Sequence, residues 1–184
     1  MGKDPRVVHP MRTSPQMVYG LQLLISMLPD NLTGVEIGSY AGESATIFAE
    51  SGKFKKLICV DMWDPNYYSG QQLIAAEKVF DEVVEKYACI EKMKMNSKHL
   101  LKIKDKVDFV YIDGNHKEAF VRRDIQNALE LLSRGGCNIL AGHDYSYRKS
   151  PGVKPAVKDL LKFPDAVFCD YSWVKFIGRL PKTS

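Results

Sequence analysis

The segment GVEIGSYAGES at residues 34–44 constrains the fold more than any other part of the chain. Val35 and Ile37 are β-branched residues that favour a strand, and Ser44 stands where a helix start prefers a hydroxyl group. Between them, Gly38 and Gly42 allow the backbone to turn and to approach a ligand closely. The segment therefore predicts a strand, a tight turn and a helix, the repeating unit of α/β proteins.

The rest of the chain repeats this unit. Strands are expected at residues 35–38, 56–61, 90–95, 107–113 and 137–142. Helices are expected at residues 14–28, 43–50, 71–87, 117–132 and 152–163, with a short helix from residue 97 and a closing hairpin of residues 166–171 and 173–178. Strands that alternate with helices imply parallel pairing, and the hairpin adds one antiparallel strand. The expected fold is α/β: a Rossmann-like, doubly wound, mostly parallel seven-stranded sheet with helices on both faces.

A chain of 184 residues with 45% hydrophobic content can bury a full core as one domain. We expect a single domain over residues 1–184, with a helical extension at 1–32 and the Rossmann-like core at 33–178. The chain has neither an apolar run of signal-peptide length at its N-terminus nor a stretch that approaches a membrane span. It is therefore expected to be cytoplasmic, with no membrane partner. Without a C-x-x-C pair, its widely spaced cysteines are expected to be buried free thiols: Cys59, Cys89, Cys137 and Cys169.

The formal net charge of +4 comes largely from two lysine-rich segments, residues 53–56 and 98–106. Solvated helix and turn faces explain such segments better than a nucleic-acid groove does. The charge pattern therefore disfavours nucleic acid as a partner.

An acidic residue, Glu36, lies inside the first strand. The glycines that follow it are spaced G-x-x-x-G, and not G-x-G-x-x-G as in dinucleotide-binding turns. A carboxylate here repels a phosphate and suits a cationic, hydroxylated ligand. S-adenosylmethionine, a sulfonium that carries an amino acid and a ribose, fits this description, whereas a nicotinamide dinucleotide does not.

Polar residues follow the other parallel strands directly, namely Asp61, Asn96, Asp113 and the pair His143-Asp144. Ligands of open α/β sheets bind beyond the carboxyl ends of the strands, so these side chains are expected to converge on one crevice. Asp61 suits the two hydroxyls of a ribose, with Met62 and Trp63 beside it to cover an adenine face. Taken singly, each acid is better explained as a strand-end cap. Their agreement indicates a site.

Six motifs, in this order and spacing, resemble the class I S-adenosylmethionine-dependent methyltransferases. The resemblance is closest to the small O-methyltransferases, which include catechol O-methyltransferase and the macrolide-sugar methyltransferases, and it extends from Thr33 to about Gly178. The motifs are VEIGSYAGES (35–44), the acid in CVDMW (59–63), Asn96-Ser97, YIDGNH (111–116), ALELLSRGGCNILAGHDY (128–145) and PGVKPAVKDLL (151–161).

The resemblance implies a set of cofactor-binding residues. Asp61 would hold the ribose hydroxyls, Met62 and Ser97 would flank the adenine, and Asp113 would lie near the methionine end. The residues expected to contact S-adenosylmethionine are Glu36, Gly38, Ser39, Tyr40, Gly42, Ser44, Asp61, Met62, Trp63, Asn96, Ser97 and Asp113.

A hydroxyl that accepts a methyl group must lose its proton, and the sequence offers two devices for this. A divalent cation, Mg or Mn, bound by Asp113, His143 and Asp144 would lower the pKa of the hydroxyl. Alternatively, His116 or His143 acts as a general base. Catechol-type enzymes have a lysine base three residues after the first metal-binding acid, and His116 occupies that position here. The candidate catalytic residues are therefore Asp113, His116 and His143.

The expected function is methylation of a hydroxyl on a small-molecule acceptor by an S-adenosylmethionine-dependent methyltransferase. An RNA-directed methyltransferase and a non-catalytic nucleoside-binding protein are the alternatives, and a homodimer stays open. Acceptor recognition would rest on loops at residues 62–70 and 145–151. Their candidate contact residues, which would equally serve to pack the loops, are Tyr67, Tyr68, Tyr145, Tyr147 and Arg148.

Overall fold

The protein, seen in a computed structural model, is described over residues 14–66 and 70–178. One sheet contains β1 (Leu32–Ile37), β2 (Phe54–Asp61), β3 (Ile90–Lys94), β4 (Phe109–Ile112), β5 (Ile139–Gly142), β6 (Ala166–Val167) and β7 (Trp173–Phe176). The helices are α1 (Pro15–Ser26), α2 (Glu43–Glu50), α3 (Gly70–Lys86), the 3-10 helix η1 (Ser97–Lys102), α4 (Glu118–Leu132) and α5 (Val153–Leu161). In the part of the chain that the structure describes, none of these helices is long and apolar enough to cross a membrane.

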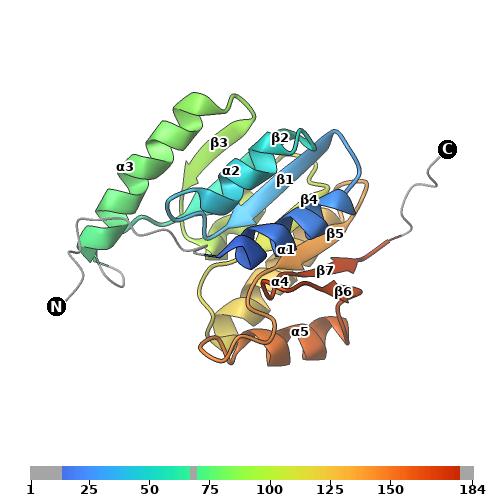
Figure 1. The fold of residues 1–184 in the computed structure, drawn as a ribbon. Helices are drawn as coiled ribbons and strands as arrows, with labels where there is room; N and C mark the ends of the chain where they lie inside the picture. The colour runs from blue at the N-terminus through green and yellow to red at the C-terminus, as the bar shows by residue number, and fades with distance from the viewer. Residues whose placement is uncertain (1–13, 67–69, 179–184) are drawn as a thin grey trace.

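The strand order is β3-β2-β1-β4-β5-β7-β6. Strands β1 to β5 pair in parallel, β7 runs antiparallel to β5, and β6 pairs antiparallel with β7. Figure 1 shows the helices on both sides of this sheet. The expected α/β class, the seven strands and the single reversed strand are thus confirmed. Because the chain builds outward from β1 to β3 and then returns to place β4 on the other side of β1, a ligand crevice is expected between the ends of β1 and β4.

Side chains along the strands alternate between two hydrophobic layers. Val35 and Ile37 of β1 pack in the layer that contains residues of α4, α5 and η1. Glu36 lies between them and points to the opposite layer, since its register partners Cys59 and Tyr111 pack there with α1 and α2. The strand period therefore buries one carboxyl group in an otherwise apolar layer.

The strand boundaries that differ most from the sequence-based expectation are the start of β1 and the end of β6. β1 begins at Leu32, because it already pairs with Phe54 at the start of β2. β6 covers only two residues of the expected 166–171, because the chain turns early. In this turn Asp170 accepts a hydrogen bond from the backbone N–H of Ser172 (3.0 Å), and Tyr171 has a φ of 68°.

All four cysteines are free thiols, as expected. Their burial was predicted less well, since Cys59 is buried, Cys89 and Cys137 are partly exposed and Cys169 is exposed. Cys169 lies in the tight turn between β6 and β7, where a short loop leaves its side chain on the surface.

Helix α1 packs directly against this turn, and Gly20 makes the close approach possible. A Cβ atom added to Gly20 would lie 2.2 Å from Oδ1 of the buried Asp170. Replacing Gly20 with Ala is therefore expected to lower the free energy of unfolding by about 1–3 kcal/mol, although Ala is the better helix former. Urea denaturation checks this. Gln22→Ala, at an exposed position of the same helix, is the control, and equal stability of the two variants would contradict the close packing.

Candidate active site

The turn after β1 requires glycine at its first position. Gly38 has a φ of 91°, and a Cβ atom added there would lie 2.2 Å from the carbonyl oxygen of Asp113. Gly42 has a φ of 86° and stands at the N-terminus of α2. Both glycines thus have the turn conformation that the sequence predicts, and the turn lies against the end of β4.

Backbone hydrogen bonds continue the sheet one step past the strands. Gly38 N–H donates to Val60 (2.8 Å), Asp113 N–H to Ile37 (2.8 Å) and His143 N–H to Ile112 (3.0 Å). These bonds fix the starts of the loops after β1, β4 and β5 side by side. The convergence of the strand ends is therefore a property of the backbone, independent of the side chains.

Glu36 is fully buried, and Ser44 of α2 donates a hydrogen bond to its Oε1 (2.5 Å). Burial, together with the nearby Asp113, raises the pKa of Glu36 to about 7, although the Ser44 bond opposes the shift. The sequence-based argument treated Glu36 as an ordinary carboxylate. In the folded protein its pKa lies well above the ordinary value, because an apolar layer encloses it.

Asp61, at the end of β2, accepts three backbone hydrogen bonds. Its Oδ2 accepts from Tyr40 N–H (2.9 Å), and its Oδ1 accepts from the N–H groups of Met62 (2.6 Å) and Trp63 (3.3 Å). Burial raises the pKa of Asp61, and these three donors lower it. Asp61 therefore links the turn after β1 to the loop after β2. This is the role of a strand-end cap, which was the expectation for this acid taken singly.

Residues expected at the adenine face are only partly brought together. The Asn96 side-chain amide donates to Met62 Sδ (3.0 Å), so these two side chains adjoin as expected. Ser97 lies next to them in the chain, and its Oγ accepts from Arg123 of α4 (3.1 Å). Trp63 is not exposed to any crevice. Its ring is fully buried against Phe80 of α3, with 4.9 Å between ring centroids.

The three residues expected to bind a metal do come together. One ligand atom from each of Asp113, His143 and Asp144 lies within 4.8 Å of the other two. His143 Nδ1 lies 2.9 Å from Asp144 Oδ1 and 3.8 Å from Asp113 Oδ1. Asp144 is buried, which raises its pKa, but hydrogen bonds from His143 and Ser150 outweigh burial and hold the pKa below its ordinary value. The cluster thus offers two carboxylates and an imidazole to one point.

His116, three residues after Asp113, joins the same cluster. Its Nε2 lies 3.4 Å from Asp113 Oδ1, and its Nδ1 lies 3.1 Å from Ser150 Oγ. The single hydrogen of Ser150 Oγ is already donated to Asp144 (2.6 Å), so His116 Nδ1 must carry the hydrogen of the neutral ring. Burial alone would lower the pKa of His116, but Asp113 and Asp144 raise it above its ordinary value. The nitrogen left to take up a proton is Nε2.

Sequence reasoning did not identify Ser150 or Asp170 as site residues. Ser150 comes from the loop after β5. Asp170 comes from the turn between β6 and β7, and its Oδ2 lies 3.9 Å from His143 Nε2. Asp170 is 1% exposed and also accepts a hydrogen bond from the Ser172 hydroxyl (2.7 Å). Its two-residue spacing to Ser172 signals a turn. No sequence signal places it beside His143. Of the expected acceptor contacts, Tyr67 and Tyr68 lie outside the described residues.

Comparison with known proteins identifies the family. A model described as a methyltransferase domain matches residues 35–145 of this chain, from β1 to the loop after β5. The chain belongs to this methyltransferase family. The matched range includes the turn after β1 and the cluster of Asp113, His116, His143 and Asp144. This family membership and the fold together support a class I S-adenosylmethionine-dependent methyltransferase.

The methyltransferase is also similar to an uncharacterised protein of Acanthamoeba polyphaga mimivirus, with 28% identity over 166 residues that cover 84% of this chain and 71% of the relative. Similar solved structures include a precorrin 8w decarboxylase of Methanobacterium thermoautotrophicum (TM-score 0.60, 15% identity, 86% of this chain and 77% of the other). An rRNA methylase of Streptococcus thermophilus gives a TM-score of 0.58 at 14% identity (88% and 95% covered). A candidate methyltransferase of Streptococcus mutans, solved in complex with SAH, gives 0.58 at 12% identity (88% and 96%). At such identities the likeness concerns the fold alone.

Proposed function

We propose that this methyltransferase transfers a methyl group from S-adenosylmethionine to a hydroxyl of a small-molecule acceptor. The observation that carries the proposal is the position of the polar cluster. Asp113, His143 and Asp144 point ligand atoms at one place, and the glycine turn that suits the cofactor lies against the backbone of Asp113. A hydroxyl held at the cluster would therefore lie beside the cofactor turn.

Polar atoms buried near the turn support S-adenosylmethionine as the cofactor. Ser39 and Cys59 lie close enough to the Glu36 carboxyl group to lower its pKa, but Glu36 Oε2 and Ser39 Oγ have no hydrogen-bond partner of good geometry within the described residues. A buried polar atom without a partner costs free energy, which a donor group of a ligand would recover. Glu36 and Ser39 would hold the amino-acid part of the cofactor, and Asp61 the ribose hydroxyls. The solved Streptococcus mutans structure, with SAH bound in a similar fold, supports S-adenosylmethionine as the cofactor.

The bound cofactor supplies a methyl group on a sulfonium, from which it is displaced in line. The residues of this chain must align the acceptor and remove its proton. When an acceptor hydroxyl takes up the methyl group of the cofactor, its proton would pass to His116 Nε2, the ring nitrogen that faces Asp113 Oδ1 (3.4 Å). Ser150 and Asp144 keep the opposite edge of His116 oriented.

A divalent cation is the second means of activating the hydroxyl. Asp113, His143 and Asp144 would hold Mg or Mn, because two carboxylates and one imidazole suit these cations. A cation at this point would lower the pKa of a coordinated hydroxyl.

Calorimetry with S-adenosylmethionine, with and without magnesium, tests the proposal. We expect the cofactor to bind at micromolar concentrations, and the absence of binding at millimolar cofactor would refute the proposed function. Magnesium binding that is lost in Asp144→Asn would support the cation device. Cofactor binding and turnover that do not respond to magnesium or to a chelator would leave His116 as the base.

Replacing Asp61 with Ala is expected to weaken cofactor binding by about 1–3 kcal/mol, the scale of a lost hydrogen bond to a charged group. The variant loses the proposed ribose acceptor and also frees the turn at Tyr40 that Asp61 holds. Calorimetric dissociation constants for SAH measure the effect. Asp64→Ala, in the same loop, is the control and should bind normally. Unchanged affinity in the Asp61 variant would discredit its ribose role.

A further inference from the structure

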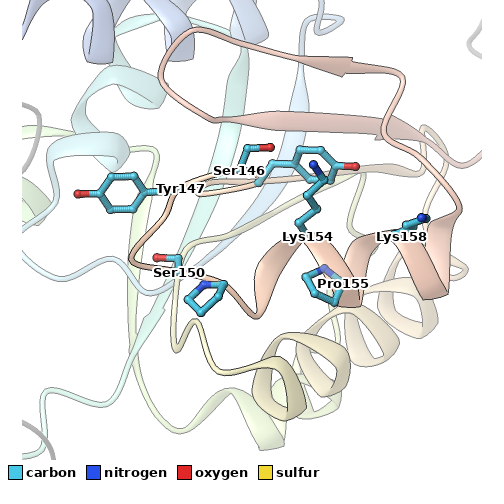
Figure 2. A pocket seen from close by; sticks show the side chains of 8 residues that line it. Ser146, Tyr147, Ser150, Lys154, Pro155 and Lys158 are labelled. Atoms are coloured by element: carbon cyan, nitrogen blue, oxygen red, sulfur yellow. The ribbon is translucent and has the colours of Figure 1, made fainter.

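We infer that the cavity beside the loop after β5 binds the methyl acceptor, and that this acceptor carries an anionic group, a carboxylate or a phosphate. The inference rests on the proposed function. The cavity is a hollow open to solvent, with a volume of about 400 Å³. Figure 2 shows its lining side chains, which come from the loop and from α5: Tyr145, Ser146, Tyr147, Ser150, Pro151, Lys154, Pro155 and Lys158.

Ser150 connects this cavity to the polar cluster. It lines the cavity, and its Oγ contacts both Asp144 (2.6 Å) and His116 (3.1 Å). The side chain of Ser150 is 4% exposed, so it forms a thin wall between the cavity and the cluster. A molecule in the cavity therefore lies on the Nδ1 side of His116, separated from the polar cluster by the Ser150 side chain.

Two lysines supply the charge on one side of the cavity. Lys154 and Lys158 are one helical turn apart on α5, so both side chains lie on the same face of the helix. In Figure 2 Lys154 extends from the helix toward the loop, and its Nζ lies 5.8 Å from the centre of the Tyr145 ring. Within the described residues neither lysine forms an ion pair, although α5 also carries Asp159, which pairs with Arg122 instead. Both ammonium groups are thus available to an anionic ligand.

The remaining walls are suited to a ring-shaped, apolar body. Tyr145 is 8% exposed and belongs to the hydrophobic core, so its ring is a fixed surface. Pro151 and Pro155 add rigid apolar contacts, because proline has little conformational freedom to lose. An acceptor that fits this cavity has a compact apolar frame, an anionic group toward α5 and a hydroxyl that extends past Ser150 to the polar cluster.

Charge across the wider segment favours the same ligand. Residues 148–162 contain five cationic side chains against the single acid Asp159, namely Arg148, Lys149, Lys154, Lys158 and Lys162. An excess of positive charge in the segment that forms the cavity raises the local concentration of anions. The small volume of the cavity and its two lining lysines favour a small anionic acceptor over a polynucleotide.

Ligand-observed and ¹⁵N-detected NMR titrations of the full chain test the inference with defined probes. The probes are 4-hydroxybenzoate, its neutral counterpart 4-hydroxybenzyl alcohol, and 4-nitrophenyl phosphate, with a 20-nucleotide RNA as the macromolecular anion. We expect at least one of the two anionic small molecules to bind about tenfold or more tightly than the neutral alcohol, as suits a charge-assisted contact. Which of the two binds better identifies carboxylate or phosphate as the preferred group.

The Lys154→Gln/Lys158→Gln double variant is expected to abolish this preference. The matched control is Lys149→Gln, which removes one positive charge from the neighbouring loop without touching the cavity, and it should keep the preference. Equal binding of anionic and neutral probes would overturn the inference, as would a preference that survives in the double variant. Tighter binding of the RNA than of the small anions would also overturn the inference, if Lys149→Gln weakens that RNA binding as much as the double variant does. Since the titrations need no cofactor, a failure of S-adenosylmethionine binding would refute the proposed function separately.

Discussion

Replacing His116 with Gln is expected to lower kcat by about 10²–10⁴-fold, the range for loss of a general base. Gln has similar length and keeps a polar group near Ser150, but it does not take up a proton at neutral pH. Because His116 is not among the residues proposed to contact S-adenosylmethionine, the affinity for this cofactor should be unchanged. The rate of SAH formation with an acceptor that turns over measures kcat, and calorimetry measures the affinity.

His99→Gln is the matched control, since His99 lies on η1 without contact to the cluster and its side chain is exposed. Ser150→Ala should lower kcat by a smaller factor, because it removes the hydrogen bond that orients His116 and leaves Nε2 in place. A His116→Gln enzyme that retains kcat within about threefold would exclude His116 as the base. A cation at Asp113, His143 and Asp144 would then be the remaining means of activation.

The second large effect concerns stability and arises from Glu36. Its pKa rises from the ordinary 4.5 to about 7 on folding, so the folded protein binds a proton that the unfolded chain releases. Below pH 4.5 Glu36 is protonated in both states, so its ionisation does not lower the free energy of unfolding. As the pH rises from 4.5 to about 7, only the unfolded chain releases the proton, and the free energy of unfolding falls. Each pKa unit corresponds to about 1.4 kcal/mol, which gives a cost of roughly 3 kcal/mol above pH 7.

Glu36→Gln is expected to remove this dependence, since Gln is nearly isosteric, accepts the Ser44 hydrogen bond and does not ionise. The difference in unfolding free energy between variant and wild type should move by about 3 kcal/mol in favour of the variant between pH 4.5 and pH 8. Urea denaturation at several pH values measures this difference. Glu82→Gln, at an exposed position of α3, should show no such trend. A flat difference for Glu36→Gln would mean that the carboxyl group is solvated in the folded protein.

Much of the fold was predictable because its signals are local. The turn after β1 is encoded by Gly38 and Gly42, whose positive φ angles few other residues tolerate. The strand-end acids were predictable as a group, since parallel strands place their carboxyl ends on one edge of the sheet. Asp113, His143 and Asp144 were assigned to one cluster on this basis, and they lie together.

Other features depend on contacts between distant segments. Trp63 was expected at the crevice, yet its ring is enclosed beneath α3. Its position one residue beyond Met62 gave no sign of this, because the local φ of 40° redirects the chain. Asp170 likewise comes within 3.9 Å of His143 only because β7 pairs with β5.

The sequence by itself determined the α/β class, the glycine turn that suits a nucleoside cofactor and the set of polar residues at the strand ends. These follow from periodicity and backbone preference, which act over a few residues. Only the tertiary structure decided the raised pKa of Glu36, the partners of the two His116 ring nitrogens and the cavity that Ser150 shares with the cluster. Each of these depends on burial or on a partner from another part of the chain, and such contacts exist only after the sheet and its helices have packed together.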